Sequence, residues 1–256
     1  IRCIVERILA RECREAGLQG VWIGDEVMRF VERHGWPGNV RQLQNVVEQV
    51  CALATTPLIP RTLVERALRV TIDYRIDPDT GVVARSAVIE NGGPTDVRID
   101  QAAAAGLTLP VAQDYRLHYS TGRWAAEWTR QERPLRAGAT VLESRRGSTG
   151  SQNNPWFAIT RATTTEESGP AWIGALAWSG SWRITIDQDV TGRVRIVGGY
   201  NPFDFAYRLK PGMRLETPTL YAGYSDEGMG GASRLFHRFQ RDHVLPRRDG
   251  RVPVRK

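Results

Sequence analysis

The spacing of apolar residues divides the chain into a helical part and a longer part with β-strand character. Up to about residue 69, apolar residues recur every three or four positions, as in Ile4, Val5 and Ile8. This period is typical of helices that bury one face. From Val70 onward the period is two, which is typical of strands that bury alternate side chains.

Turn and capping signals set the limits of the expected helices. Asp25 is placed to cap a second helix, and the turn Pro37-Gly38-Asn39 ends in a residue that can cap a third. Gln42 follows three residues later, as in a capping box. We therefore expect three helices and a short fourth before residue 69.

Successive hairpin signals follow in the second part of the chain. Residues 70–76 alternate between apolar and polar, residues 77–81 form a turn rich in Asp, Pro and Gly, and a second strand follows. The expected strands after the turn lie at 82–90, 115–119, 182–186 and 194–197. Only the segment from about 230 to 243 returns to helical spacing.

These patterns predict a mainly β fold, an antiparallel β-sandwich preceded by a small module of three to four helices. The expected domains are the helical module over residues 1–69, the sandwich over 70–249 and a basic tail over 250–256. Because the seam near residue 69 has no Gly/Ser linker, we expect the two modules to abut. The first residue, Ile1, lies inside an expected helix, so we interpret the sequence as a fragment.

The net charge of +7 is concentrated at the end of the chain. Residues 234–256 contain eight Arg or Lys and two Asp, which leaves about one net positive charge for the rest. No aromatic platform is interleaved with this basic segment, so we interpret it as a solvated end and expect no nucleic-acid partner. No apolar stretch is long enough to span a bilayer, so we expect no membrane partner.

The cysteines and histidines indicate neither a disulfide framework nor a metal site. Cys3, Cys13 and Cys51 form no CxxC motif, and the four histidines show no metal-ligand spacing. We expect buried thiols, no metal and no cofactor. Free thiols fit a reducing compartment, so the expected location is the cytoplasm.

One motif in the helical part resembles a known signature. Residues 36–43 read Trp-Pro-Gly-Asn-Val-Arg-Gln-Leu, which is similar to the motif that closes the ATPase domain of sigma-54-dependent transcriptional activators. The resemblance covers about residues 1–68 and makes this module a fragment like the lid of AAA+ ATPases. It implies a nucleotide-binding role for Arg41, because the family's arginine at this position reaches the nucleotide phosphates. The sequence has no GxxxxGK[ST] loop, so we expect no ATP hydrolysis and a vestigial Arg41.

Several motifs in the second part carry another resemblance. They lie at residues 119–124, 143–157, 176–182, 199–205 and 216–218. In order and spacing they are similar to the signatures of the N-terminal β-supersandwich domain of family 36 glycoside hydrolases, chiefly α-galactosidases. One departure is Ser151, which stands where many relatives have histidine. The family's earliest strands have no counterpart before Val70, so the resemblance implies an incomplete supersandwich.

The resemblance also implies where the chemistry of such an enzyme lies. The family hydrolyses its substrate with two carboxylates about 5 Å apart, and both belong to a catalytic barrel. Neither catalytic motif occurs in this chain, so we assign no catalytic residue and expect the chain alone to be inactive. The implied partner is the catalytic barrel of an α-galactosidase, and a homo-oligomer is left open.

Loops rich in Gly and Pro, and a cluster of tryptophans, supply candidate binding residues. Six of the eight tryptophans lie between residues 124 and 182. They favour a sandwich core over a sugar-stacking platform, and Trp178 and Trp182 share strand parity, so we expect them to face the same side. The candidates for a domain interface or a sugar-facing surface are Arg146, Asn154, Trp156, Trp178, Trp182, Asn201 and Asp204.

Three functional hypotheses remain from the sequence. The first is the non-catalytic N-terminal domain of an α-galactosidase, truncated and fused. The second is a sugar-sensing regulatory protein linked to sigma-54-dependent transcription, although we expect galactosides to bind weakly if they bind at all. The third is a chance junction without function. A truncated sheet exposes its hydrogen-bonding edges, so we also expect poor solubility.

Overall fold

The computed structural model describes the whole chain except residues 16–21, 34–38, 54–57, 60–68, 94 and 248–256. The chain folds into two compact units. The smaller unit comprises Ile1–Thr71, Val88–Gln101 and Phe205–Glu216. The larger unit comprises Ile72–Ala87, Ala102–Asp204 and Thr217–Lys256. Each unit has an apolar core of its own.

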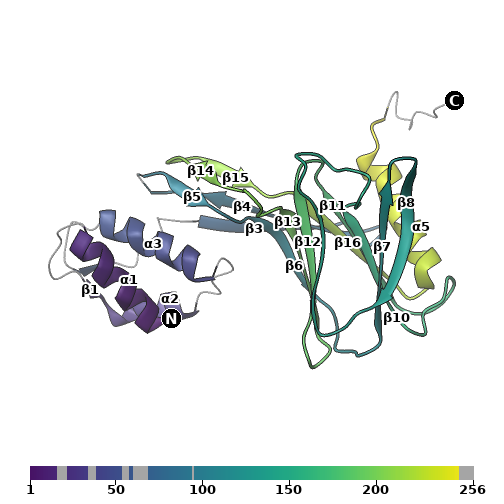
Figure 1. Cartoon of the computed structure of the whole chain (residues 1–256), viewed down its shortest axis with the longest axis horizontal. Coiled ribbons are helices and arrows are strands. Elements are labelled where there is room, and N and C mark those ends of the chain that lie inside the picture. Colours follow the sequence, from purple (N-terminus) through teal and green to yellow (C-terminus); the bar gives the residue numbers. More distant parts are fainter. Residues whose placement is uncertain (16–21, 34–38, 54–57, 60–68, 94, 248–256) are drawn as a thin grey trace. The chain divides into compact units, whose positions relative to one another are not determined.

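The smaller unit contains the helical module (Figure 1). Its helices are α1 (Arg2–Glu15), α2 (Asp25–Arg33) and α3 (Asn39–Leu53), and the short strands β1 (Trp22–Ile23) and β2 (Leu58–Ile59) pair in parallel. Apolar residues of all three helices form its core, Val5, Met28 and Val50 among them. The three expected helices are confirmed, and two of them begin at Asp25 and Asn39. The carbonyl of Gly24 accepts the amide of Met28, so Asp25 is the first residue of its helix and Gly24 holds the expected cap position. The expected short fourth helix lies outside the described residues.

Two short strand pairs complete the smaller unit. In one, β5 (Val97–Ile99) pairs antiparallel with β14 (Tyr207–Leu209). In the other, β15 (Arg214–Glu216) pairs with residues 88–90 of β4 (Val83–Glu90). The buried amide of Asn91 donates to the carbonyl oxygens of Thr95 and Leu209, at 2.7 and 2.8 Å. This side chain thus joins the turn after β4 to β14.

The larger unit is an antiparallel β-sandwich (Figure 1). One sheet has the order β4-β16-β11-β10-β7-β8, with β3 paired to β4, and the other has the order β6-β13-β12-β9. Besides β4, the strands of these two sheets are β3 (Arg69–Ile76), β6 (Ala103–Thr108), β7 (Tyr115–Arg123), β8 (Ala126–Pro134), β9 (Gly138–Ser144), β10 (Trp156–Arg161), β11 (Ala171–Ala177), β12 (Trp182–Gln188), β13 (Val194–Tyr200) and β16 (Thr219–Ser225). The predicted fold class is confirmed.

Alternation along the strands builds the core between the two sheets. On β12 every second side chain, Trp182, Ile184 and Ile186, is fully buried. These meet apolar side chains of the opposite sheet, such as Phe157 and Ile159 of β10. The buried indole Nε1 of Trp182 is satisfied, because it donates to the hydroxyl of Thr149 at 3.1 Å.

A C-terminal helix covers part of the first sheet. Helix α5 (Gly228–Phe239) continues into a π-helical turn, η1 (Gln240–Val244). Phe236 and Phe239 are buried against Val82 and the half-buried Ile173 and Tyr221. The helix expected from about 230 to 243 is therefore confirmed, and its apolar side faces β16 and β11.

The expectations for the tryptophans were partly wrong. Strand β11 ends before Trp178, and β12 begins at Trp182, so a turn separates the two rings and strand parity does not apply. Trp182 is fully buried, whereas Trp178 is 40% exposed. Trp124 and Trp128, at the tip of the β7–β8 hairpin, are also exposed. The favoured core interpretation holds for Trp182 and fails for the exposed rings.

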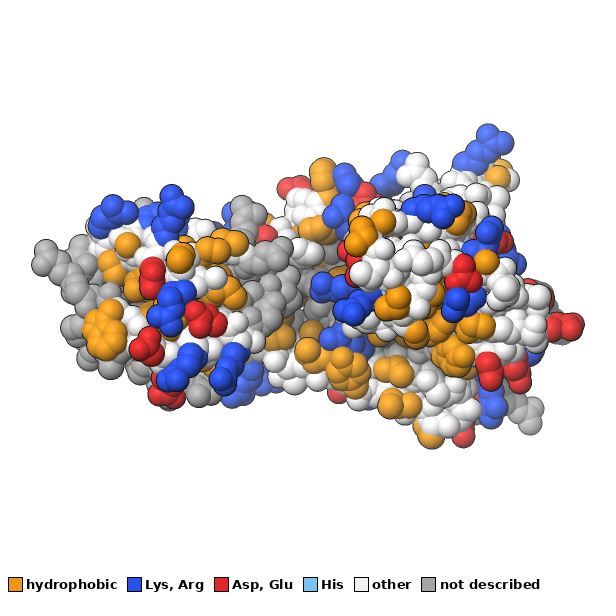
Figure 2. All heavy atoms as spheres, turned by 90° about the horizontal axis from the view of Figure 1, so that it is seen from below, with side chains coloured by type: hydrophobic (Ala, Val, Ile, Leu, Met, Phe, Trp, Pro, Cys, Tyr) orange, Lys and Arg blue, Asp and Glu red, His pale blue; other side chains and the backbone are white. Residues whose placement is uncertain are grey.

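Charged side chains are mixed on the surface. On the face shown in Figure 2, Lys and Arg side chains are interspersed with Asp and Glu, so this face presents no continuous basic stripe. Within the described ranges, no helix has the length and apolar character needed to cross a membrane.

A buried glycine of β11 provides a test of the packing between β10 and β11. A Cβ atom on Gly174 would lie 2.6 Å from Cε1 of Phe157, whose ring is itself buried. We expect Gly174→Ala to lower the free energy of unfolding by about 1 to 3 kcal/mol, because neither the ring nor the strand has space to move. Urea unfolding followed by tryptophan fluorescence measures the loss.

Gly106→Ala is the matched control for this substitution. Gly106 also lies in a strand, β6, but the nearest atom to its added Cβ is the tip of Arg85, at 3.7 Å. We expect its effect to stay within about 0.5 kcal/mol. Equal effects of the two substitutions would contradict the tight packing at Gly174.

Candidate functional site

Four loops meet at one end of the β-sandwich, the upper end in Figure 1. We refer to this region as the four-loop end, and its segments are residues 124–125, 145–155, 178–181 and 201–204. Backbone hydrogen bonds tie these loops together. The amide of Thr149 donates to the carbonyl of Ser179 at 2.7 Å, and that of Asn201 donates to the carbonyl of Ser181 at 3.2 Å. Because antiparallel strands turn at the same end, loops far apart in the sequence become neighbours.

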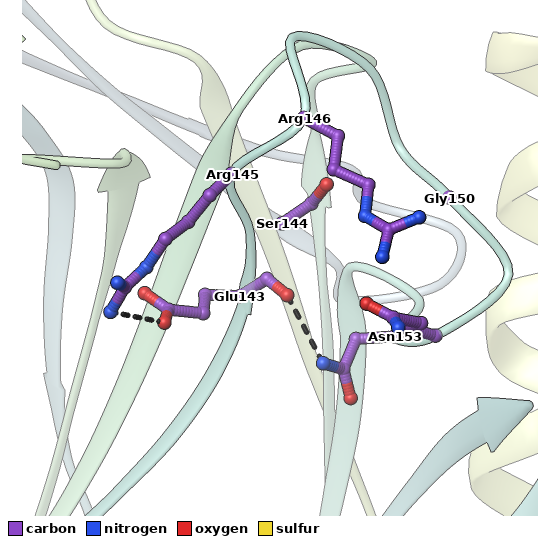
Figure 3. A pocket seen from close by; sticks show the side chains of 7 residues that line it. Glu143, Ser144, Arg145, Arg146, Gly150 and Asn153 are labelled. Carbon is purple, nitrogen blue, oxygen red and sulfur yellow. Dashed lines mark hydrogen bonds and ion pairs between the residues drawn. The ribbon is translucent and has the colours of Figure 1, made fainter. Parts of the chain in front are cut away.

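The carboxylate of Glu143 lies beside the guanidinium of Arg145 at this end of the sandwich (Figure 3). Glu143 and Arg183 are directly opposite on β9 and β12, and Nε of Arg183 donates to Oε2 at 2.9 Å. Arg145 follows Glu143 by two residues in the chain, and its Nη2 lies 2.6 Å from Oε1 of Glu143. The amide of Asn201 donates to Oε2 at 3.1 Å. The carboxylate thus has three partners from three different segments.

These partners determine the charge of Glu143. Burial by itself raises the pKa of this carboxyl group, but the hydrogen bonds from Arg145, Arg183 and Asn201 together outweigh burial. The pKa of Glu143 therefore lies below its ordinary value. Glu143 is an anion at neutral pH, which suits a structural acceptor and does not suit a proton donor.

The side chain of Asn201 connects the loop after β13 to both neighbouring strands. It is buried, and its Nδ2 group lies 3.1 Å from the carbonyl oxygens of Ser144 and Trp182 in addition to Glu143. Its Oδ1 accepts the backbone N–H of Phe203 at 3.0 Å. Every polar atom of the amide is therefore used, which fixes the path of the loop.

A polar hollow of about 370 Å³ opens beside this cluster. It is lined by Glu143, Ser144, Arg145, Arg146, Gly150, Gln152 and Asn153. Figure 3 shows the Arg146 side chain extending over the hollow. Within the described part of the chain, no carboxylate pairs with this exposed guanidinium. The hollow therefore offers a free cation and amide groups, which suit a polar or anionic group.

Exposed aromatic rings surround the four-loop end. Trp124, Trp128 and Phe203 are 88%, 65% and 59% exposed. The ring of Trp178 stands edge-on to Tyr200 with centroids 5.0 Å apart. Exposed rings of this size, gathered at one end, are typical of a binding surface.

Backbone strain is concentrated at the same end. In the described part of the chain, the residues other than glycine with positive φ are Ala125, Trp128 and Asp204, at 60°, 61° and 54°. Such conformations cost about 1 kcal/mol or more each and persist where surrounding structure holds them. All three positions belong to the four-loop end or its adjoining β8 strand.

The structure gathers the candidates from the β part at this end. Arg146, Asn154, Trp178, Asn201 and Asp204 lie in its loops, whereas Trp156 and Trp182 are the first residues of β10 and β12. Their roles as interface or sugar-facing residues stay predictions. Two buried atoms here, Oδ1 of Asn154 and Nε1 of Trp156, have no hydrogen-bond partner among the described residues.

The remaining candidate, Arg41, lies in α3 of the smaller unit. Its side chain, like the preceding motif residues 36–38, is outside what the structure describes. Its nucleotide-binding role is therefore still a prediction. Among the described residues, no three His, Cys, Asp or Glu side chains are grouped as metal ligands.

Sequence reasoning missed the residues that organise the site. Glu143, Arg145 and Arg183 were not among the candidates, although they make the central ion pairs. The sequence contained one signal for the pair Glu143 and Arg145. Their charges are opposite and two residues apart, and side chains at this spacing on a strand point to the same face. The pairing of Glu143 with Arg183, 40 residues away, depends on which strands become neighbours.

Comparisons with known proteins identify relatives of both parts of the chain. A family model described as the glycosyl hydrolase family 36 N-terminal domain matches residues 55–210. A model described as an AAA+ ATPase lid domain matches residues 1–75. The two matches overlap at residues 55–75, across the predicted boundary at residue 69. Both resemblances expected from the sequence are confirmed, and the link to sigma-54-dependent activators stays a prediction.

Curated relatives of the β part are α-galactosidases. The chain is 34% identical over 177 residues to α-galactosidase AgaA of Geobacillus stearothermophilus, covering 69% of this chain and 24% of that protein. It is 32% identical over 179 residues to α-galactosidase C of Emericella nidulans, covering 70% and 24%. The chain thus spans about a quarter of the length of the curated relatives it matches.

Solved structures give the same result. The crystal structure of AgaA matches with a TM-score of 0.67 and 32% identity, covering 70% of this chain and 25% of that chain. The α-galactosidase of Lactobacillus brevis matches with a TM-score of 0.68 and 29% identity, covering 70% and 24%. The architecture of the larger unit is therefore that of the corresponding part of these enzymes.

The Asn201 amide provides a test of the cluster around Glu143. In Asn201→Asp, a carboxylate would face the Glu143 carboxylate and two carbonyl oxygens. We expect the free energy of unfolding of the larger unit to fall by about 3 kcal/mol, because the buried new charge lies against the Glu143 anion and two carbonyl oxygens and has no hydrogen to donate to them. Gln152→Ala, at an exposed side chain of the same hollow, is the control and should stay within about 0.5 kcal/mol. Urea unfolding measures both, and a mild effect of Asn201→Asp would contradict the described network.

The lowered pKa of Glu143 predicts a change in the pH dependence of stability. A carboxyl group whose pKa is depressed by folding stabilises the folded state above its unfolded pKa, about 4.3. That contribution disappears as the pH falls through the lower folded pKa. We expect Glu143→Gln to be less stable than the original chain at pH 7, and the difference to shrink on acidification.

Urea midpoints measured from neutral pH to about pH 3 test this expectation. Other carboxyl groups with lowered pKa, such as Asp114 and Glu132, still titrate in the variant. The stability of the variant should therefore still fall on acidification, but less than that of the original chain. Glu167→Gln, at an exposed loop position, is the control. If the stability difference between Glu143→Gln and the original chain did not change with pH, the lowered pKa of Glu143 would be refuted.

Proposed function

Because the chain belongs, over residues 55–210, to the glycosyl hydrolase family 36 N-terminal domain family, we propose that its β-sandwich is a non-catalytic accessory domain of an α-galactosidase. The observation that carries this proposal is the extent of the likeness. About 70% of this chain aligns with only 24% of each enzyme. On this proposal, the chain contributes to α-galactoside hydrolysis through a catalytic module and does not hydrolyse substrate alone.

The carboxyl groups of the larger unit support a non-catalytic role. Retaining hydrolysis needs a carboxylic acid with a raised pKa close to a second carboxylate. In the described part of the chain, the carboxyl groups with a shifted pKa, Glu143 and Asp114 among them, are shifted downward. Glu143 is also held by two arginines. It would serve as a structural anion in the accessory domain.

The four-loop end is the proposed contact surface for the catalytic module. Arg146 and Trp178 are exposed there and would touch the partner, together with Asp204. Asn201 and Trp182 are buried and would position the loops.

The cysteines support a cytoplasmic location for this domain. Cys3, Cys13 and Cys51 are free, but the expectation of buried thiols holds only for Cys51, because Cys3 is exposed and Cys13 is half-buried. Burial raises the pKa of the Cys51 thiol to about 12, so this thiol is protonated and unreactive at neutral pH. Free thiols without disulfide partners are typical of a reducing compartment.

The helical module is proposed to keep the fold of an AAA+ lid without nucleotide chemistry. Its apolar core is contributed by α1, α2 and α3, which supports an intact small module. Arg41 would bind phosphate only if an ATPase core were supplied. The proposed origin of the module is a sigma-54-dependent activator.

A segment exchange tests the proposed accessory role. Residues 72–247 would replace the matching segment of α-galactosidase AgaA. We expect the exchanged enzyme to hydrolyse nitrophenyl α-galactoside, because the sandwich retains the surface that the rest of the enzyme needs. The present chain alone should show no turnover above buffer. Turnover by the isolated chain, or an inactive but folded exchange, would overturn the proposal.

Variants of the exchanged enzyme test the contact surface. We expect Arg146→Glu and Trp178→Ala to lower its activity or its melting temperature, because both side chains are exposed at the proposed contact. Val190→Ala is the control, since Val190 is 86% exposed in the β12–β13 turn at the opposite end. If all three variants behave alike, the catalytic module docks elsewhere.

A second candidate function is carbohydrate binding. It is favoured by one observation, the exposure of Trp124, Trp128 and Trp178 at the four-loop end. Flat exposed rings can stack on the apolar face of a sugar. Titration of the chain with raffinose, compared with Trp124→Ala and Trp178→Ala, tests this alternative. Affinity that is millimolar or weaker would exclude it.

A further inference from the structure

Strand β3 forms an exposed edge of the first sheet. Among the described strands, β3 pairs with β4 and with no other. All its residues are exposed, and Ile72, Tyr74 and Ile76 are 49%, 57% and 68% exposed. An open edge with apolar side chains is a site where a further strand can pair.

The hairpin turn determines which backbone groups of β3 are free. The amide of Asp77 donates to the carbonyl of Val82 across the turn. Hydrogen-bonded positions alternate along an antiparallel pair, so Asp73 and Arg75 direct their backbone groups toward β4. Ile72, Tyr74 and Ile76 therefore direct their N–H and C=O groups away from β4, toward the open edge.

Tyr74 marks the centre of a symmetric segment. Residues 72–76 read Ile-Asp-Tyr-Arg-Ile, with the three apolar side chains on one face and the two charged side chains on the other. The guanidinium of Arg85 lies over the Tyr74 ring at 5.0 Å, which holds the ring on the sheet. Nε of Arg75 lies 3.2 Å from Oδ2 of Asp73. The segment is therefore self-complementary when a second copy runs antiparallel to it.

When two copies pair antiparallel with the two-fold axis at Tyr74, every residue from 72 to 76 lies opposite a suitable partner. Ile72 then lies opposite Ile76 of the second copy, and Tyr74 lies opposite its own equivalent. Asp73 lies opposite Arg75 of the second copy, and the same pair forms again on the other side of the axis. Ile72, Tyr74 and Ile76 each find backbone partners, because their free groups face one another.

Neighbouring registers are less favourable. After a shift by one residue, Tyr74 of one copy lies opposite Asp73 or Arg75 of the other. The backbone groups of Asp73 and Arg75 already bond to β4, so the free groups of Tyr74 would have no partner there. A shift by two residues places Asp73 opposite Asp73, or Arg75 opposite Arg75, in the two copies. Like charges directly opposite are destabilising. Charge therefore selects the register centred on Tyr74.

We propose that β3 is a self-association surface, through which two copies of this chain pair antiparallel along residues 72–76. The occupant of the edge is thus a second copy, selected by the reciprocal match of Asp73 with Arg75. This proposal does not depend on the accessory role in an α-galactosidase, because it rests on β3 alone.

Charge reversal at the two positions tests the proposal with the full chain. Sedimentation velocity over a dilution series should show a dimer for the original chain. Asp73→Arg and Arg75→Asp should each weaken the dimer about tenfold, because each turns both cross-strand pairs into like-charge pairs. The double variant D73R/R75D should restore the original affinity, since the charges are exchanged and still match.

An equimolar mixture of the two single variants is a second test. One copy then carries Arg at both positions and the other carries Asp at both, so a heterodimer has opposite charges throughout. We expect the mixture to associate more tightly than either variant alone. Far-UV circular dichroism should be the same for all variants, because both side chains are on the surface.

Hydrogen exchange identifies the contact itself. The amides of Ile72, Tyr74 and Ile76 should become protected as the concentration rises. The proposal is overturned if the original chain stays monomeric, or if single and double variants associate equally, because another surface would then hold the copies together. Protection of these amides in the monomer would also overturn it, since a segment of the same chain would cover the edge.

Discussion

The partly buried carboxylate of Glu143 requires charged and polar partners, and this requirement organises one end of the sandwich. Burial would favour the neutral acid, whereas two arginines and one amide keep it ionised. Its partners come from β9, β12 and the loop after β13. A single anion therefore joins segments that are distant in sequence. The loop after β13, which carries the positive φ of Asp204, is fixed at its base by Asn201 of this cluster.

The apolar and polar parts of the larger unit lie at different places along its strands. Its middle is apolar, with Trp182, Ile184 and Ile186 facing the opposite sheet. The polar hollow and the exposed aromatic rings lie at the ends of the strands and in the loops that follow them. Substitutions of the exposed loop side chains can thus change this surface without opening the core. This arrangement fits a domain that supports a partner and performs no chemistry of its own.

Local patterns in the sequence were sufficient for much of the fold. Period-two alternation identified β3 and β12, and capping signals at Asp25 and Asn39 located two helices, because these signals act within a few residues. The expectation for Trp178 failed because the turn over residues 178–181 interrupts the alternation between Trp178 and Trp182. The pair Glu143–Arg183 was missed for a different reason. Its members become neighbours only through the pairing of β9 with β12, and strand order is a global property.

The hydrogen bond between Asn91 and Leu209 has a consequence for the order of folding. It spans 118 residues, and the segment between them contains β6 to β13. Closing so long a loop in an unfolded chain has a large entropic cost. The folded sandwich removes most of that cost, because the amide of Tyr200 bonds to the carbonyl of Ala102 and brings the two ends of the segment together. We therefore expect the β5–β14 pair to form late, after the sandwich has brought its two strands close together.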